Sequence, residues 1–284
     1  MIPQRPAAQA PPPARQRGLS LEVVRPLALG ALSTAVVFGA LAWWVTTSPQ
    51  WSRIQEQFFS TDAMRAAFPR VLQGFWLNLR IFVVAQVVIL VLALLVAVAR
   101  SLTGPVAAPL RLGAVVFVDL LRGVPSLLLI LLFGFGIPAL QLPGLSRSSL
   151  FWGAVGLILS YSAYTAEVYR SGMDAVHDGQ RAAAKALGLS QWQSLRFAII
   201  PQAVRNVTPA LLNGAVSLQK DVVLLSVIGV REAVREAQIY TSATFNYSSY
   251  VVAAILFLLA SVPLARFTDW YARRDQQRRL QSTF

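Results

Sequence analysis

Long apolar stretches alternate with short polar segments along most of the chain. Several of these stretches approach or exceed the roughly 20 residues that an α-helix needs to cross the hydrocarbon core of a bilayer. In chain order, the stretches cover residues 26–47, 75–99, 112–140, 150–166, 204–218 and 250–267. The pattern predicts an all-α membrane protein with about six transmembrane helices.

Two of the stretches contain features that an ordinary lipid-facing helix lacks. The third is interrupted by the quartet RGVP at 122–125, and a charge beside glycine and proline indicates a break in the helix. The fifth is less apolar, which is typical of a helix that faces protein or water rather than lipid. Its polar and helix-bending residues are Asn206, Thr208, Pro209, Asn213 and Ser217.

Basic residues between the stretches predict the orientation in the membrane. The net charge is +13, and most arginines and lysines lie between or beyond the apolar stretches. Because cytoplasmic loops carry such an excess, both termini and the loops at 100–111 and 169–205 are expected in the cytoplasm. The segments at 48–70 and 220–247 are expected outside. The second of these balances Lys220, Arg231 and Arg235 with Asp221, Glu232 and Glu236.

The same pattern divides the chain into five segments. The first is a disordered, basic, proline-rich cytoplasmic tail, and an additional transmembrane helix, an outer loop, a membrane-spanning core and a basic cytoplasmic tail follow. Their predicted bounds are 1–25, 26–47, 48–70, 71–272 and 273–284.

Composition excludes several kinds of chemistry. Hydrophobic residues make up 56% of the chain and charged residues only 13%, whereas soluble domains carry about 25% charged residues. The chain has no cysteine and a single histidine, His177, so a metal site or a catalytic triad has almost nothing to be built from. The basic charge is explained by loops, so no nucleic-acid partner is expected. A membrane-embedded enzyme is therefore disfavoured.

An alanine-rich, cationic stretch at 181–201 predicts a helical hairpin in the cytoplasm. Asp178 is expected to cap a first helix at 179–187, and Gly188 suits the left-handed residue that ends it. A second helix begins at Ser190, where Gln193 completes a capping box, and Pro201 begins or kinks the helix that re-enters the membrane.

The first helix of this hairpin has a face of small side chains. Arg181 and Lys185 share one side, while Ala182, Ala183 and Ala186 form a low-profile surface on which another backbone can approach closely. Two interpretations remain: an ordinary surface hairpin, or a docking element for a cytoplasmic partner.

The hairpin resembles the cytoplasmic signature of the membrane subunits of binding-protein-dependent ABC importers, polar amino-acid branch. That signature reads E-A-A, three residues, G, nine residues, I-x-L-P. It falls here on Ala182, Ala183, Ala184, Gly188, Ala198, Ile200 and Pro201. The spacing is intact, but alanine replaces the glutamate at 182 and the isoleucine at 198, and isoleucine replaces the leucine at 200.

Three further segments resemble the same branch. VDLLRGVP at 118–125 is similar to V-E-x-x-R-G-T-P, and YTAEVYRSG at 164–172 is similar to A-Y-x-A-E-x-x-R-G-G. LQKDVVLLSVIGV at 218–230 is similar to L-L-K-D-T-S-L-L-S-V-I-G-V. Together they cover residues 74–284, so the resemblance implies a five-helix permease core preceded by one extra helix.

The resemblance implies a division of labour in a bacterial cytoplasmic (inner) membrane. An extracytoplasmic amino-acid-binding protein delivers the substrate, two permease subunits form the path, and two cytoplasmic ATPases bind ATP and Mg. The second permease is either another copy or a paralogue. This chain has no G-x-x-x-x-G-K-[ST] motif, so it is expected to be non-catalytic and to bind no cofactor itself. Ala182, Ala183, Ala184, Lys185, Gly188 and Pro201 would couple it to the ATPase.

Candidates for the substrate path are Arg122, Asn213, Ser217 and Asp221. Asn213 and Ser217 lie on one helical face, although hydrogen bonds between helices explain such residues equally well. Residues 203–220 contain no acid, which favours a neutral or acidic substrate unless Asp221 faces the path.

Two pairs at i, i+3 are expected to be structural ion pairs: Asp119 with Arg122, and Glu167 with Arg170. Apart from Asp119 and Glu167, the predicted spans lack acids, and no inverted repeat is visible. A self-contained secondary amino-acid carrier, which needs coupling carboxylates or such a repeat, is therefore the less favoured alternative.

Overall fold

The computed structural model describes residues 21–281, with side chains from 28 to 277, and every regular element in this range is helical. The predicted tail at 1–25 therefore falls mostly outside the described residues. The chain divides into two units, 1–55 and 56–284. In the first unit, α1 (Leu21–Thr46) contains the predicted first span, and its side chains are almost all exposed, as a lipid-facing helix requires.

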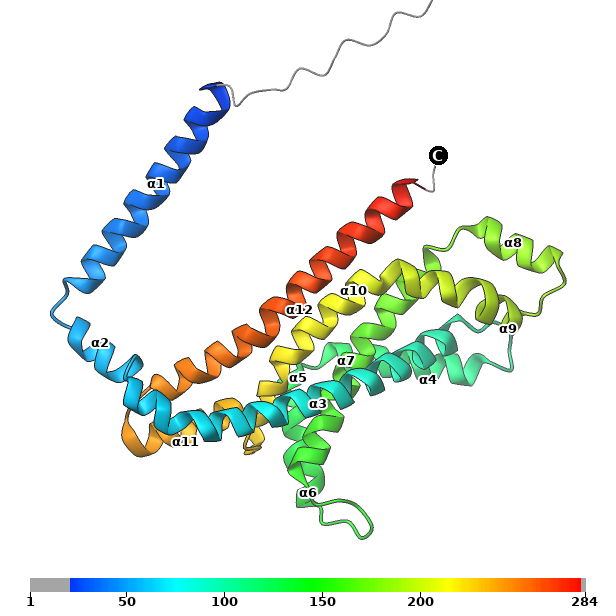
Figure 1. Ribbon diagram of the computed structural model, residues 1–284. Coiled ribbons are helices and arrows are strands. Elements are labelled where there is room, and N and C mark those ends of the chain that lie inside the picture. Colours follow the sequence, from blue (N-terminus) through cyan, green and yellow to red (C-terminus); the bar gives the residue numbers. More distant parts are fainter. Residues whose placement is uncertain (1–20, 282–284) are drawn as a thin grey trace, which may run out of the picture. The chain divides into compact units, whose positions relative to one another are not determined.

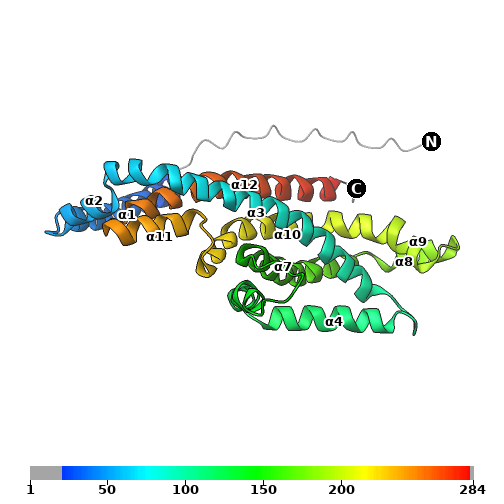
Figure 2. The ribbon, with the colours of Figure 1, turned by 90° about the horizontal axis from the view of Figure 1, so that it is seen from below.

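The second unit is built around four long helices among the described residues, and Figures 1 and 2 show how they are arranged. They are α3 (Thr61–Ser101), α7 (Ser149–Asp174), α10 (Ile200–Asp221) and α12 (Ser248–Gln281). The shorter α4 (Ala108–Gly123) packs against α3 and α7. Helices α8 (Asp178–Ala186) and α9 (Gln191–Ser194) project from one end of this bundle, and α11 (Ala233–Thr244) lies at the other end (Figures 1 and 2).

Small side chains allow these helices to pack closely. On α3, three alanines, Ala85, Ala93 and Ala97, share one face with the larger Ile89, at four-residue spacing, and all four are at most 1% exposed. Residues at this spacing lie on one helical face. Because lipid is as apolar as the side chains, helices in a membrane associate largely through such close contact. The stripe lets α7 pack along α3.

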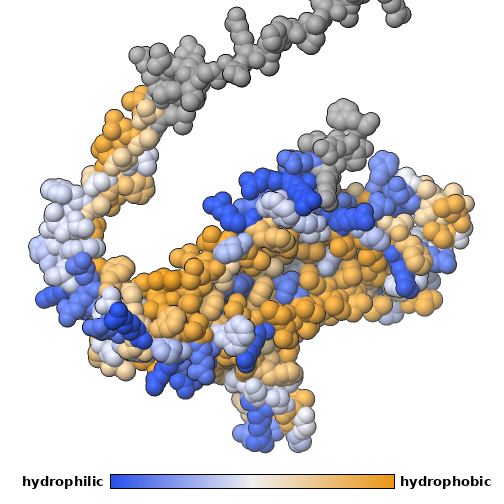
Figure 3. All heavy atoms as spheres, viewed as in Figure 1, coloured by the Kyte–Doolittle hydropathy of each residue, from blue (hydrophilic) through white to orange (hydrophobic). Residues whose placement is uncertain are grey.

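An apolar band covers the middle of the second unit on the face that Figure 3 shows. Figure 3 shows it over α10 and α12, with hydrophilic side chains near the C-terminal end of α12 and others around α11. This distribution is expected of a bundle whose middle lies in hydrocarbon and whose two ends are in water.

Four helical segments are long and apolar enough to cross a membrane, or five if one bent pair counts as a single span, among the described residues. The segments are Ala28–Thr46, Trp51–Ser101, Gln191–Ile228 and Ser248–Gln277, and the bent pair is Ala108–Gly123 with Ser126–Ala139. The remaining predicted span, 150–166, lies in α7, which has 26 residues but includes serines and tyrosines that lower its hydropathy.

The third predicted span is a broken element rather than one helix. Helix α4 ends at Gly123, the chain is extended at Val124, and α5 (Ser126–Leu131) starts after Pro125 at an angle of 102°. A short π-helix, η1 (Leu132–Gly136), and the short α6 (Ile137–Ala139) continue this element. The break predicted at 122–125 is therefore confirmed.

Helix extends into the segments predicted as an outer loop, 48–70, and as a basic tail, 273–284. Residues 48–70 contain α2 (Trp51–Phe58) and the beginning of α3, which Ser60 caps by accepting a hydrogen bond from the Ala63 amide at 3.3 Å. At the other terminus α12 continues to Gln281, so the tail expected at 273–284 is largely the end of a helix. Arginine and glutamine are good helix formers, which explains why the helix outlasts the apolar stretch.

Candidate functional site

The predicted hairpin is present between α7 and α10. The Ser190 hydroxyl accepts a hydrogen bond from the Gln193 amide at 3.3 Å, and the Gln193 side chain accepts one from the Ser190 amide at 2.8 Å, which confirms the capping box. Gly188 has a φ of +76°, in the left-handed region that favours glycine. The amide of the next residue, Leu189, donates to the carbonyl of Ala184 at 3.1 Å and so closes the end of α8.

The start of α8 differs from the prediction by one residue. His177, not Asp178, is the cap, because its Nδ1 accepts a hydrogen bond from the Gly179 amide at 3.0 Å. Asp178 is instead the first residue of the helix, where a carboxylate interacts favourably with the helix dipole.

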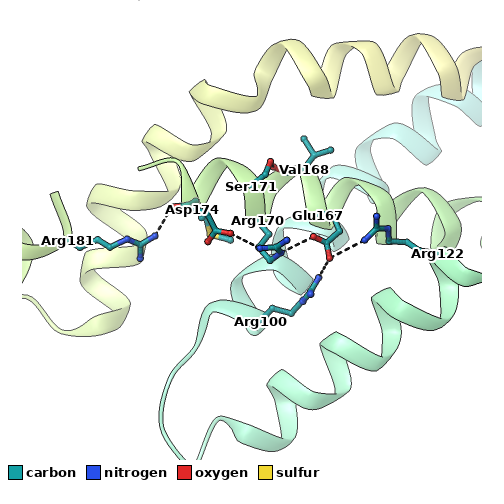
Figure 4. Close-up of polar contacts among 9 residues, drawn as sticks. Arg100, Arg122, Glu167, Val168, Arg170, Ser171, Asp174 and Arg181 are labelled. Atoms are coloured by element: carbon teal, nitrogen blue, oxygen red, sulfur yellow. Dashed lines mark hydrogen bonds and ion pairs between the residues drawn. The ribbon is translucent and has the colours of Figure 1, made fainter. Parts of the chain in front are cut away.

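The small residues of α8 are presented to the outside. Ala182, Ala183, Ala186 and Lys185 are exposed, whereas Ala184 is 4% exposed and holds the helix against the rest of the unit. The Arg181 guanidinium donates to the carbonyl of Met173 at 2.7 Å, so α8 is tied directly to the end of α7 (Figure 4).

The far end of the hairpin runs into the membrane helix without a loop. A short π-helix, η2 (Leu195–Ile199), leads into α10. The exposed Pro201 lies in the first turn of α10, as predicted. The hairpin is therefore continuous with α10 at one side and hydrogen-bonded to α7 at the other.

An ionic cluster centred on Glu167 lies close to the hairpin (Figure 4). Glu167 forms ion pairs with Arg100 from α3, with Arg122 from the end of α4 at 3.4 Å, and with Arg170 at 2.8 Å. Arg170 also pairs with Asp174 at 2.6 Å. One carboxylate thus joins three helices.

This cluster confirms one predicted ion pair and overturns the other. Glu167 and Arg170 form the expected contact, but Asp119 and Arg122 do not. Arg122 is directed to Glu167 on α7, and Asp119 is exposed on α4. The sequence could not indicate this exchange, because it depends on how α4 and α7 pack.

A cavity of about 350 Å³ lies between α3, α7 and α10. This volume is at the lower end of the range for small-molecule sites. Ile89, Leu90 and Val168 contribute apolar wall, and Gln86, Ser126, Tyr161, Tyr164, Thr165, Ser217 and Asp221 contribute polar groups. The Tyr161 hydroxyl donates to the Asp221 carboxylate at 2.6 Å. Of the residues that line the cavity, only Asp221 carries a charge.

The predicted path residues lie in different places. Ser217 and Asp221 line the cavity, but Asn213, although exposed on the same helix, does not. Arg122 lies beside it: its carbonyl accepts a hydrogen bond from the Tyr164 hydroxyl at 3.3 Å, and its guanidinium lies 5.7 Å from the centre of the Tyr164 ring.

Sequence reasoning missed Tyr161 and Gln86, which also line the cavity. Tyr161 and Tyr164 lie three residues apart in an otherwise apolar span, so they share a helical face. From this spacing, the sequence could have predicted that α7 contributes polar side chains to a cavity.

At the opposite end of the unit, the acidic residues of the predicted outer segment do not all form ion pairs with its basic residues. Arg231 pairs with Glu236 at 2.7 Å, but Glu232 caps α11 by accepting from the amides of Val234 and Arg235 at 3.0 and 2.8 Å. Burial raises the pKa of Glu232 despite these bonds and a third from the side chain of Asn78 at 3.0 Å.

Helix α3 meets this capped turn at Gly74. A Cβ atom at Gly74 would lie 2.6 Å from the carbonyl carbon of Glu232, so only glycine permits the approach. The contact places the Asn78 side chain where it bonds both the Glu232 carboxylate and the Ala233 amide.

The protein family described as "Binding-protein-dependent transport system inner membrane component" matches residues 103–276, more than half of the chain. The probable amino-acid ABC transporter permease protein YckA of Bacillus subtilis (strain 168) is 33% identical over 211 residues, which cover 74% of this chain and 89% of that protein. The arginine transport system permease protein ArtQ of the same organism is 30% identical over 199 residues, 70% of this chain and 89% of that protein.

A solved structure also resembles the chain. It is described as "Crystal structure of an amino acid ABC transporter with histidines" and superposes with a TM-score of 0.63 at 28% identity. The match covers 72% of this chain and 94% of the other chain.

Proposed function

This chain belongs to the binding-protein-dependent transport system inner membrane components, and from this premise we propose that it forms the path of an ATP-driven amino-acid importer. Relatives of 30% identity or more that span most of its length are amino-acid permeases. In the proposal, the chain shares the path with a second permease subunit and receives its driving motion from two cytoplasmic ATPase subunits through α8.

The exposed alanine face of α8 carries this proposal. A helix that transmits motion needs a surface that a partner can approach closely and a rigid connection to the membrane helices. Ala182, Ala183 and Ala186 supply that surface. Arg181 and the π-helix at 195–199 supply the connection to α7 and α10. Such an element passes on rigid-body movement rather than absorbing it.

The cavity is proposed as the substrate site within the path. Its single carboxylate, Asp221, can pair with an ammonium group in a half-buried setting where an unpaired charge is costly. The preference for a neutral or acidic substrate rested on the lack of acids at 203–220. Because Asp221 faces the cavity, we favour a neutral or cationic amino acid, and an acidic one is disfavoured.

The remaining assembly follows the same proposal. ATP and Mg bind the ATPase subunits, this chain holds no cofactor, and a binding protein delivers the amino acid from outside the bacterial cytoplasmic membrane. The end of the bundle with α8 faces the cytoplasm, together with both termini, and the end with α11 faces outward.

A secondary carrier is the alternative function. It would need coupling carboxylates available to a bound ion. Glu167 is engaged by three arginines and Asp119 is exposed on α4 outside the cavity, so Asp221 is the one carboxylate among the residues that line the cavity. A single carboxylate that also accepts a hydrogen bond from Tyr161 is a weak basis for ion coupling.

Single cysteines test both the docking and the orientation, because the chain has none of its own. Ala183→Cys on α8 should cross-link to a co-purifying ATPase and should react with an impermeant maleimide only after cells are opened. Ala243→Cys, exposed on α11, is the matched control; it should not cross-link to the ATPase and should react in intact cells. Cross-linking of neither cysteine, with uptake retained, would support the carrier instead.

A further inference from the structure

A second cavity, of about 460 Å³, lies at the end of the bundle that carries the hairpin. Three arginines line it: Arg100 from α3, Arg111 from α4 and Arg170 from α7. The rest of its wall is Ala108, Leu112 and Val115. It is separate from the proposed substrate cavity, since the two share no lining residue.

The positive charge around this cavity is only partly neutralised. Glu167 pairs with Arg100, Arg122 and Arg170, and Asp174 pairs with Arg170 (Figure 4). Arg111 reaches no carboxylate of the described residues; its guanidinium donates only to the carbonyl of Leu102, at 3.3 Å. The three arginines that line the cavity and their two carboxylate partners, Glu167 and Asp174, therefore leave an excess of one positive charge, to which the nearby Arg122 adds.

An apolar surface continues from the cavity along α4. Leu112, which lines the cavity, is 64% exposed, and Val116 and Leu120, one and two turns further along, are 46% and 63% exposed. Residues at this spacing lie along one face of the helix, which also carries the exposed Asp119 beside Leu120. The cavity is thus lined by arginines, and a row of exposed apolar side chains runs from it along α4 toward the hydrocarbon layer.

We propose that this cavity binds the headgroup of an anionic phospholipid, with the acyl chains lying along the exposed face of α4. Guanidinium groups bind phosphate through paired hydrogen bonds, and basic pockets between membrane helices recognise anionic headgroups. The row of exposed apolar side chains favours a lipid over a free anion, because a soluble phosphate would make no use of it. The bound lipid would join α3, α4 and α7 beside the coupling hairpin.

Native mass spectrometry of the purified complex can measure this binding. After delipidation, phosphatidylglycerol is expected to be retained in preference to phosphatidylcholine. Arg111→Gln should lower retention of phosphatidylglycerol about fivefold, the effect of one basic residue near an anionic lipid. Because Arg111 makes no ion pair with Glu167 or Asp174, this variant leaves the cluster that joins the helices intact.

Two further variants complete the test. Arg111→Lys keeps the charge and should retain more lipid than Arg111→Gln. Arg274→Gln removes the same charge near the end of α12, where Arg274 lies over the ring of Trp270, and should leave retention unchanged. Equal retention by the wild type and Arg111→Gln would overturn the proposal. So would displacement of the bound species by millimolar inorganic phosphate without preference between the two lipids, which would indicate a free-anion site.

Discussion

Asp221 is the residue on which the proposed substrate site depends most. It is the single charged group that lines the cavity, and it accepts a hydrogen bond from Tyr161 across 60 positions of the chain. The sequence indicated Asp221 as a candidate path residue, and it predicted that an Asp221 facing the path would remove the preference for a neutral or acidic substrate. It could not indicate Tyr161 as its partner, because that contact arises only when α7 and α10 pack together.

Replacing Asp221 tests this role. Asp221→Asn should raise the KM for the transported amino acid by about 10- to 100-fold, because a hydrogen bond to a charged group is worth about 1.5–3 kcal/mol. Tyr161→Phe should have a smaller effect, about 2- to 10-fold, because it removes only one hydrogen bond. Uptake assays at varied substrate concentration would measure both changes.

Asn213→Leu is the control for this pair, since Asn213 lies on the same helix as Asp221 but outside the cavity. Its KM should equal that of the wild type. A larger change for Asn213→Leu than for Asp221→Asn would move the substrate site away from the cavity.

Glu167 has a structural role that a second substitution tests. It is 17% exposed and surrounded by three arginines, so Glu167→Gln would leave their charges uncompensated. We expect a loss of about 2–4 kcal/mol in unfolding free energy, as for other partly buried pairs that lose one partner. Thermal unfolding in detergent would show it as a lower Tm.

Asp174→Asn is the matched change at the edge of the same cluster. Asp174 is 61% exposed, so the loss should stay below about 1 kcal/mol. Equal losses for the two variants would contradict the central position of Glu167.

At the scale of single elements, the hairpin is the part that local sequence determines best. Capping residues, alanines and a glycine specify it without help from distant contacts, and its capping box and left-handed Gly188 are as predicted. The broken third span is similar, because glycine and proline act locally. The helical character of 48–70 and of the last residues of α12 was missed, since polar residues alone do not end a helix.

Changes in α8 should uncouple transport without unfolding the membrane helices. Ala183→Glu places a charge on the proposed docking face of α8. Burying this charge against the ATPase is costly, so ATP-driven uptake should fall at least about tenfold. Gly188→Pro should have the same effect, because proline fixes φ near −65° whereas this residue has a φ of +76°. Uptake and Tm should be measured on the same preparations.

The control is Ala243→Glu, an equal change on the exposed surface of α11 at the other end of the unit. It should leave both uptake and Tm at the wild-type level. Normal uptake by Ala183→Glu and Gly188→Pro would make the hairpin an ordinary surface feature.

At the scale of the whole molecule, the second unit places a small cavity among membrane helices, with the hairpin at one end and α11 at the other (Figure 1). Helices α7 and α10 line the cavity, and both connect directly to the hairpin. Movement of α8 would therefore reach the cavity walls through two continuous helices. This arrangement fits a subunit driven from outside its own chain.

Transport by reconstituted protein tests this account most directly. Proteoliposomes should be prepared with the complete complex and, in parallel, with this chain and its permease partner but without the ATPase; both should receive the loaded binding protein. We expect amino-acid uptake only with the complete complex, and only when ATP is supplied on the side of the membrane that carries the ATPase subunits. Uptake of equal rate without the ATPase, driven by an ion gradient, would contradict the account and establish a secondary carrier.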